Sequence, residues 1–271
     1  MNNNILKLSL KIINKAKELG ANLAGTTSVE ELKDCPSCKA AAKIPQSGIM
    51  GTSSKILGLK PGEISWPEEG KSVVVIALCH PESNPEMDWW YGKRSPQGNK
   101  KLINIINELG KWIRENYELK TYHIPYHIEK GGIYLKDAAV MAGLGCIGKN
   151  NLLVTPEYGP RIRLRALIIN KKIASTGPKS FDPCSNCKEF CLKNCPVNAF
   201  NNKVRHKEII GINKMPGRIG NYDYLKCNIQ MKEDVESADK NNSLNNKTGN
   251  NICEPIKYCR TCEFTCPVGI K

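Results

Sequence analysis

The sequence contains no hydrophobic run long enough to cross a membrane. Its longest strictly aliphatic stretch, VVVIALC at 73–79, falls far short of the roughly 20 apolar residues that a membrane span requires. The N-terminus also lacks the features of a signal peptide, because lysines interrupt its apolar residues and no small-residue cleavage site follows. These absences predict a cytoplasmic protein.

Acidic residues are in the minority. The chain has 26 Asp and Glu against 40 Lys and Arg, which gives a net charge of +14. Such an excess favours an acidic partner, namely nucleic acid, an acidic redox protein or a phosphorylated cofactor. A lysine-rich surface without a specific partner explains the same charge, so the composition leaves the partner open.

The first 175 residues contain two kinds of apolar pattern and no internal repeat. Apolar residues at helical spacing predict helices, and runs rich in β-branched residues predict strands. Together they indicate an α+β or α/β layer domain. The predicted helices cover 5–19, 100–116 and 135–143, and the predicted strands cover 21–28, 71–79, 121–129, 150–156 and 161–170.

The last of these strands alternates in character. Ile162, Leu164 and Ala166 point one way, and the arginines at 161, 163 and 165 point the other. Earlier in the chain, Ser28 and Glu31 form a capping-box signal for a further helix. The stretch 36–67, rich in Gly, Pro, Ser and Lys, is predicted to be irregular.

A domain boundary is predicted near 175–180, where the composition turns polar and the cysteine runs begin. It divides the chain into an α+β domain over 1–175 and a cysteine-rich domain over 176–271. Within the second domain, residues 236–251 are polar and low in complexity, so they are predicted to form an exposed, mobile insertion.

Thirteen cysteines without a secretion signal argue against a disulfide scaffold and favour metal or cluster ligands. The first run is Cys184-x2-Cys187-x3-Cys191-x3-Cys195-Pro196, and the second is Cys259-x2-Cys262-x3-Cys266-Pro267. The bacterial ferredoxin run is C-x2-C-x2-C-x3-C-P, one residue shorter between the second and third thiols. Zinc sites, the alternative, usually present pairs of C-x2–4-C. The repeated Cys-Pro ending favours iron–sulfur clusters over zinc.

Two cubane clusters need eight thiolates, and the two runs supply seven. Cys227 is the preferred eighth ligand, and Cys253 is the competitor. In ferredoxins the fourth cysteine of a run crosses to the other cluster. Applied here, that exchange gives one cluster Cys184, Cys187, Cys191 and Cys266, and gives the other Cys195, Cys227, Cys259 and Cys262.

The segment LKDAAVMAGLGCIGKNNLLVTPEYGPRIRLRALIIN at 135–170 carries a resemblance to a known family. It is similar to epoxyqueuosine reductases and their relatives, the reductive dehalogenases, which show AGLG-x-x-GK-x-x-LL before a cysteine-rich tail. The match extends to the N-terminal helix and strand, to the strand at 73–79 and to both cysteine runs. It therefore covers nearly the whole chain.

This resemblance implies a nitroreductase-like, cobalamin-binding α/β sandwich domain followed by a two-cluster ferredoxin-like domain. It implies two 4Fe-4S clusters that pass electrons from a ferredoxin- or flavodoxin-type donor to a base-off cobalamin, with flavin as the alternative cofactor. The implied activity is reduction of a small-molecule or nucleoside substrate.

Counting back from the AGLG segment, the family's acidic proton donor falls on Glu129. A carboxylic acid near an apolar corrin face has its pKa raised and can donate a proton; a surface glutamate beside Lys130 is the alternative. The other candidate cofactor contacts implied by the resemblance are Gly143, Gly145, Gly148, Lys149, Arg161 and Arg163. Ordinary turn glycines and solvated strand charges explain the same residues.

Three functions stay open at this stage. Relatives that act on tRNA carry a further C-terminal helical-repeat segment, whereas this sequence ends four residues after Pro267, which favours a different substrate. The alternatives are an electron-transfer protein that reduces a partner's corrinoid, and tRNA epoxyqueuosine reduction through the basic surface.

Several further side chains have no assigned role. Cys35-x2-Cys38 is a redox pair, part of a metal site or inert. Cys79 is expected in the core, and Cys146 is expected to be a small buried residue. The four histidines, at 80, 123, 127 and 206, show no ligand spacing.

Overall fold

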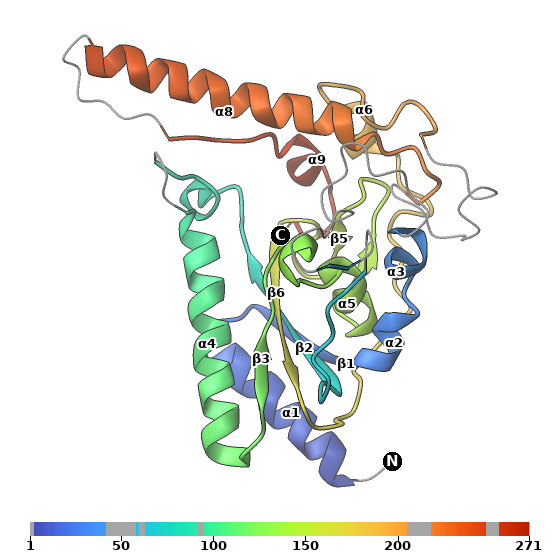
Figure 1. The fold of residues 1–271 in the computed structure, drawn as a ribbon. Helices are drawn as coiled ribbons and strands as arrows, with labels where there is room; N and C mark the ends of the chain where they lie inside the picture. Colours follow the sequence, from blue (N-terminus) through green and yellow to red (C-terminus); the bar gives the residue numbers. More distant parts are fainter. Residues whose placement is uncertain are drawn as a thin grey trace.

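The computed structural model describes residues 3–41, 58–59, 63–91, 95–204, 218–247 and 255–270. Its centre is a four-stranded sheet with the strand order β1, β2, β6, β3, in which every neighbouring pair is antiparallel (Figure 1). These strands are β1 (Leu23–Ser28), β2 (Ser72–Cys79), β3 (Thr121–His123) and β6 (Ile162–Ile169). A separate two-stranded sheet pairs β4 (Cys146–Ile147) with β5 (Leu153–Val154).

Helices cover both faces of the main sheet. α1 and α4 pack against one face, and α2 and α5 pack against the other (Figure 1). The helices near the sheet are α1 (Asn3–Glu18), α2 (Val29–Lys33), α3 (Pro36–Ala41), α4 (Gln97–Tyr117) and α5 (Leu135–Met141), with 3-10 turns η2 (Pro85–Met87) and η3 (Ile128–Lys130). The cysteine-rich part adds α6 (Phe190–Lys193), α8 (Tyr224–Lys247) and α9 (Thr261–Phe264).

The central strands are buried on both faces because apolar residues alternate between two cores. Ile162, Leu164 and Ala166 of β6 join the core beneath α2 and α5, whereas Leu167 and Ile169 join the core beneath α1 and α4. The predicted alternation of this strand is therefore confirmed. Each fully buried aliphatic side chain stabilises the fold by about 1.5–3 kcal/mol, so these two cores hold the scaffold of the site in place.

The predicted capping box at the start of α2 is confirmed. Ser28 Oγ accepts a hydrogen bond from the Glu31 amide at 3.0 Å, and the Glu31 carboxylate accepts one from the Ser28 amide at 2.8 Å. Ser175 Oγ also donates to this carboxylate, at 2.7 Å. Burial alone would raise the pKa of Glu31, but these hydrogen bonds hold it below its ordinary value.

Two predicted strands are shorter in the structure. The strand expected over 121–129 ends at His123, just before Pro125, which has no N–H to donate to a ladder. Of the strand expected over 150–156, only Leu153–Val154 forms β5, and Thr155 makes an isolated bridge to Gly159. Asn151, which precedes β5, has a left-handed φ of 59° that interrupts extended structure on that side. Pro125 is a sequence signal for the first interruption, whereas the left-handed conformation of Asn151 is seen only in the structure.

Two stretches expected to lack regular structure contain helix. Residues 36–41, predicted to be irregular, form α3. Residues 236–247 of the predicted mobile insertion form the second half of α8, and 248–251 lie outside the described residues. α8 lacks a strong apolar face, so its helical periodicity could not be seen in the sequence.

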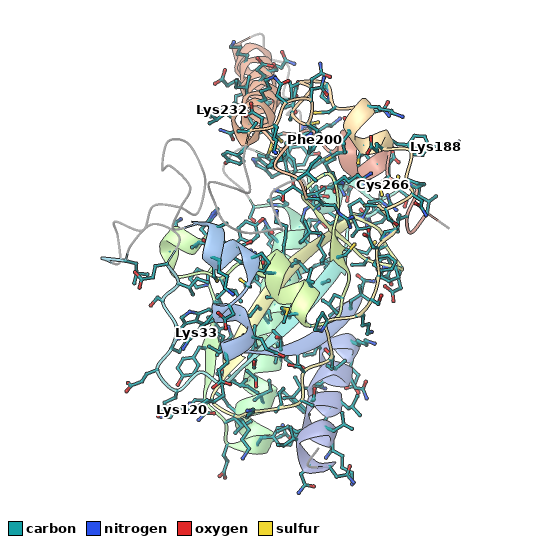
Figure 2. All side chains as sticks on the ribbon, turned by 90° about the vertical axis from the view of Figure 1, so that its right-hand side faces the viewer. Lys33, Lys120, Lys188, Phe200, Lys232 and Cys266 are labelled. Atoms are coloured by element: carbon teal, nitrogen blue, oxygen red, sulfur yellow. The ribbon has the colours of Figure 1, made fainter. Side chains whose placement is uncertain are left out.

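The cysteine-rich elements α6, α8 and α9 gather at one end of the sheet (Figure 1). Figure 2 shows Phe200, Lys232 and Cys266 at this end and Lys120 near the opposite one. No helix within the described ranges is long and apolar enough to cross a membrane.

Candidate redox site

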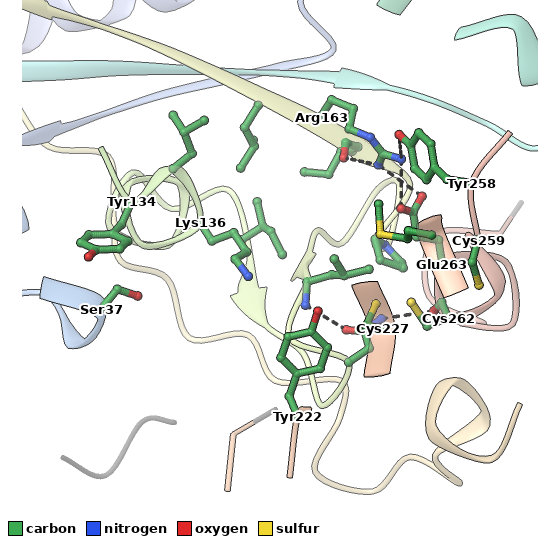
Figure 3. Close-up of a pocket in the computed structure, with 18 of the residues that line it drawn as sticks. Ser37, Tyr134, Lys136, Arg163, Tyr222, Cys227, Tyr258, Cys259, Cys262 and Glu263 are labelled. Carbon is green, nitrogen blue, oxygen red and sulfur yellow. Dashed lines mark hydrogen bonds and ion pairs between the residues drawn. The ribbon is translucent and has the colours of Figure 1, made fainter. Parts of the chain in front are cut away.

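A cavity of about 500 Å³ lies between the main sheet and the cysteine-rich end (Figure 3). Pockets that hold small molecules or cofactors span about 300–1,000 Å³. One wall is apolar and comes from residues near α5, β5 and β6: Ile133, Leu135, Leu152, Leu153, Ile162 and Leu164. The facing wall comes from the cysteine-rich part and contains Cys195, Cys227, Cys259 and Cys262.

These four cysteines, the second thiol group, lie close enough for their charges to interact. Burial, and then the neighbouring Cys259 and Cys195, raise the pKa of Cys227, while a hydrogen bond from Tyr222 opposes the rise. Burial also raises the pKa of Cys262, with Glu263, Cys227 and Cys259 adding to it. The second thiol group is thus a compact set that opens into the cavity.

A first thiol group lies behind the second one, away from the cavity. Burial and three neighbouring thiols raise the pKa of Cys191 to about 12. Those thiols belong to Cys184, Cys187 and Cys266. A small void between them is lined also by Lys149, Val154 and Pro267. The charge on Cys191 contributes to the raised pKa of Cys262, so the two thiol groups adjoin.

All eight of these cysteines are free thiols. In the described part of the chain, no three Cys, His, Asp or Glu side chains are placed to bind a single metal ion. Buried thiols with raised pKa values become thiolates only beside strong positive charge, which a bound metal supplies. Two groups of four thiols suit two clusters that are each held by four thiolates.

Of the two candidates for the eighth thiol, Cys227 and Cys253, the structure describes Cys227. Cys227 lies near the start of α8, beside Cys259 and Cys195. Cys253, the other candidate from the sequence, lies outside the described residues.

Arg161 ties the sheet to the C-terminal cysteine loop. Its Nη1 donates to the carbonyl oxygens of Glu263 at 2.9 Å and Cys266 at 3.0 Å, and its Nη2 donates to that of Val268. The side chain is buried, with 7% of its surface exposed. The sequence suggested a cofactor contact for Arg161, but its donors are directed at backbone carbonyls instead.

A buried ionic network links the same two parts of the molecule beside the cavity. Asp88 accepts a hydrogen bond from His80 Nδ1 at 2.8 Å and forms ion pairs with Arg163, at 3.1 Å, and with Arg260. Arg163 also pairs with Glu263 at 3.0 Å. Burial alone would raise the pKa of Asp88, but these partners hold it below its usual value.

Of the predicted cofactor contacts, Arg163 alone lines the cavity among the residues whose side chains are described. Gly143 has a positive φ of 73°, and a Cβ there would lie 2.6 Å from the Thr176 carbonyl oxygen. A Cβ on Gly145 or Gly148 would similarly meet protein atoms near β5. Lys149 pairs with Glu189 at 2.7 Å beside the first thiol group. Close protein packing therefore explains the glycines.

Glu129 lies in η3, and its side chain is outside the described residues. The residues flanking it on the N-terminal side, His127 and Ile128, line the cavity. His123 does not, because its ring lies near Gly110 of α4. Cys146 lies beside Cys184, and burial raises its pKa to about 11.

Several polar groups around the cavity have no recognisable signal in the sequence. Tyr134, Lys136, Tyr222 and Tyr258 line it, and Lys136 Nζ donates to the Asn151 carbonyl oxygen at 2.6 Å. Burial lowers the pKa of Lys136. None of these residues belongs to a motif, so only the fold reveals that they share one cavity.

No protein-family model matches the chain. It is 32% identical to an epoxyqueuosine reductase of Listeria monocytogenes over 216 residues, 74% of this chain and 48% of that protein. It is 37% identical to a tetrachloroethene reductive dehalogenase of Desulfitobacterium hafniense over 227 residues, 71% of this chain and 38% of that protein. The chain thus spans about half or less of the length of these two relatives.

Solved structures show the same fold. An epoxyqueuosine reductase crystallised with an epoxyqueuosine-modified tRNA stem loop matches with a TM-score of 0.62 at 21% identity, over 97% of this chain and 65% of that one. A reductive dehalogenase described in terms of B12-dependent dehalogenation matches with a TM-score of 0.60 at 16% identity, over 99% and 33%. At these identities the likeness concerns the fold.

Proposed function

Because this chain is related in sequence and fold to epoxyqueuosine reductases and reductive dehalogenases, we propose that it is an oxidoreductase that delivers electrons to a cofactor in the cavity. One observation carries this proposal. The second thiol group forms one wall of the cavity and the apolar end of the α/β domain forms the other. An electron that arrives at this thiol group is therefore next to any cofactor bound in the cavity.

Each thiol group holds one 4Fe-4S cluster in this proposal. Cys184, Cys187, Cys191 and Cys266 ligate the first cluster, and Cys195, Cys227, Cys259 and Cys262 ligate the second. Two features support the assignment. The thiols of each group lie near one another, and each group takes one thiol from the other cysteine run, as in ferredoxins. It corresponds to a cofactor domain over 1–175 and a ferredoxin-like domain over 176–271.

The cavity suits a flat cofactor with an apolar face and polar edges. Its apolar wall can contact a ring system, while His127, Lys136 and Tyr222 are polar residues of its lining. Cobalamin, the B12 cofactor named for one structural relative, is the proposed occupant, with flavin as the alternative. When bound, cobalamin supplies a metal centre that takes up electrons and reduces the substrate. The chain's own residues hold it between the apolar wall and the second cluster.

Lys136 is a candidate for supplying a proton beside this cofactor. Its amine lines the cavity, and its lowered pKa brings proton release closer to neutral pH. Glu129 stays the candidate from sequence, and its neighbours His127 and Ile128 place its backbone next to the cavity.

A nucleoside-type substrate is favoured by the relative that was crystallised with a modified tRNA stem loop. The net charge of +14 is compatible with tRNA epoxyqueuosine reduction itself, which is the second candidate. A third is reduction of a partner protein's corrinoid by the clusters, which would need no cofactor in this cavity.

The test is anaerobic reconstitution followed by addition of cobalamin. We expect iron and sulfide for two clusters and a stoichiometric cobalamin complex with a base-off visible spectrum. Leu152 lines the cavity but is not part of the main apolar core, so its substitution should leave the core intact. Leu152→Trp should weaken cobalamin binding at least tenfold, because the indole would occupy part of the cavity. Leu10→Trp, on the exposed side of α1, should bind as the unmodified protein does.

Each contrary result points to a different alternative. Full cluster content without uptake of cobalamin or flavin would favour reduction of a partner's cofactor. Tight tRNA binding that weakens steeply with salt would favour the tRNA substrate. Zinc in place of iron would contradict the proposal as a whole.

A further inference from the structure

A pair of cysteines outside the two thiol groups lies at the start of α3. Cys35 Sγ and Cys38 Sγ are 3.1 Å apart, and both are free thiols. Cys35 is 3% exposed, whereas Cys38 is partly exposed. The intervening residues are Pro36 and Ser37, which gives the sequence Cys-Pro-Ser-Cys. Two thiols in direct contact at this spacing need only small movements to form a disulfide.

The groups around the pair favour neutral thiols. Contact with Cys38, then burial, then the charge of Asp137, raise the pKa of Cys35. Cys38 donates a hydrogen bond to the Leu32 carbonyl oxygen at 3.1 Å. Asp137 is held by the amide of Ser37, at 3.2 Å, and by its hydroxyl. A thiol with a raised pKa stays protonated, so the reduced state of the pair gains little stability from thiolate formation. The dithiol form should therefore act as a reductant rather than its disulfide as an oxidant.

The pair adjoins the cavity. Ser37, between the two cysteines, lines it together with Tyr134 and Asp137. Figure 3 shows Ser37 and Tyr134 at one end of the cavity and Cys259 and Cys262 toward the other. Thiols capable of redox chemistry therefore lie near both ends of the cavity. The cysteine-rich part supplies those at one end, and the Cys35–Cys38 pair supplies those at the other.

A metal site explains the pair less well. Among the residues that the structure describes, no third Cys, His, Asp or Glu joins these two thiols to hold an ion. Simple packing does not require two sulfurs in contact, because any small apolar side chain fills such a position.

We propose that Cys35 and Cys38 form a separate redox site, a dithiol that converts reversibly to an intrachain disulfide by exchange with an external dithiol. For reduction, an external thiolate attacks Cys38 Sγ, the more exposed sulfur, and the Cys35–Cys38 bond breaks. Cys35 leaves with the bonding electron pair and takes up one proton. The second thiol of the donor then attacks the mixed disulfide, releasing Cys38, which takes up the other proton. The donor is oxidised by two electrons and the pair is reduced by two.

The test uses the anaerobically purified protein with its clusters. The protein is equilibrated with mixtures of reduced and oxidised dithiothreitol, acid-quenched, alkylated and digested with trypsin. The tryptic peptide Asp34–Lys39 contains both cysteines and no others. As the ratio of oxidised to reduced dithiothreitol rises, we expect this peptide to change from the doubly alkylated form to the unalkylated disulfide. The ratio of disulfide to dithiol peptide should be proportional to the dithiothreitol ratio, as in a two-electron exchange. Cys79, a cysteine outside the pair and both runs, should stay alkylated throughout.

Variants separate this site from the clusters. Cys38→Ser should abolish the disulfide peptide while leaving the iron content and the cluster absorption unchanged. Cys79→Ala should leave the exchange curve of Asp34–Lys39 unchanged. The proposal is overturned if the peptide stays doubly alkylated even in fully oxidised dithiothreitol. It is also overturned if metal protects the peptide from alkylation under reducing conditions and a chelator removes that protection. Neither result depends on whether cobalamin binds.

Discussion

Arg161 Nη1 donates a hydrogen bond to the Cys266 carbonyl oxygen at 3.0 Å, although the two residues are separated by 105 positions in the chain. Arg161 immediately precedes β6, the strand that supports the cavity, and Cys266 belongs to the first thiol group. The contact therefore fixes the loop that carries this thiol directly to the sheet. Because the same guanidinium also binds the carbonyls of Glu263 and Val268, it organises the whole C-terminal loop.

Arg161→Met should detach this loop. The methionine fills much of the volume but leaves three carbonyl oxygens without their donor, at a cost of about 3 kcal/mol or more in the free energy of unfolding. Denaturant unfolding of the cluster-loaded protein measures the loss, and iron should be released faster. Arg165→Met is the matched control, since Arg165 stacks over the Tyr126 ring at 4.7 Å on the same strand. Equal losses in both variants would contradict the anchoring role.

Asp88→Asn should destabilise the protein strongly. Asp88 is 3% exposed and pairs with Arg260, which is buried, and with Arg163, which is partly buried. Without this carboxylate, Glu263 alone among the described residues pairs with both arginines, so one positive charge of the network lacks a counterion. Breaking a buried ion pair in this way costs about 3–5 kcal/mol. Glu69→Gln, which breaks the exposed pair with Lys120, should change the unfolding free energy far less. Similar effects in the two variants would show that burial does not decide the strength of these pairs.

His80 should make stability depend on pH near neutrality. Burial, the largest influence, lowers its pKa from the ordinary 6.5; Asp88 opposes this shift, and the charges of Arg163 and Arg260 add to it. The unfolded chain therefore binds a proton at His80 more readily than the folded one. The resulting stability is present above pH 6.5 and is lost as the pH falls below it. His80→Asn keeps a donor for Asp88 but cannot be protonated.

Unfolding free energies measured between pH 7.5 and 5.5 check this expectation. The wild-type protein should lose more stability over this interval than His80→Asn, and effects of acid on the clusters should be shared by both. Parallel pH curves would mean that His80 keeps its ordinary pKa in the folded protein.

Local patterns were enough to predict the scaffold. The alternation of Ile162, Leu164 and Ala166 and the box formed by Ser28 and Glu31 each depend on neighbours within a few residues, where sequence and geometry are directly linked. α1 and α4 were predicted for the same reason, since their apolar residues recur at helical spacing.

Long-range partners could not be predicted. The sequence marks Arg161 and Arg163 as charges on a strand, but their partners Cys266 and Glu263 lie about a hundred residues away. Only the packing of the C-terminal loop beside β6 shows that Arg161 binds backbone carbonyls, and that Arg163 pairs with Glu263 while it lines the cavity. The polar lining of the cavity, including Lys136, is likewise assembled by the fold and has no sequence motif.

The last prediction concerns the assignment of ligands to clusters. Cys191→Ala removes one thiol of the first group, whose four members lie together, and leaves the second group complete. A cluster that loses one of four thiolate ligands is expected to assemble poorly, because cubane clusters are held by four thiolates. Iron and sulfide in the reconstituted variant should therefore fall to roughly half, with the remaining absorption typical of one cluster.

The effect of each variant on cobalamin binding distinguishes the two clusters. It should persist in Cys191→Ala, because the cavity wall belongs to the second group, whereas Cys262→Ala should lose a similar amount of iron and also disturb the cavity. Cys79→Ala, which removes a thiol outside both groups, should retain the full iron content. If Cys191→Ala lost all its iron, or if Cys262→Ala lost none, the division of the eight thiols into two independent sets would be wrong. The path of electrons toward the cavity would then need a different arrangement of ligands.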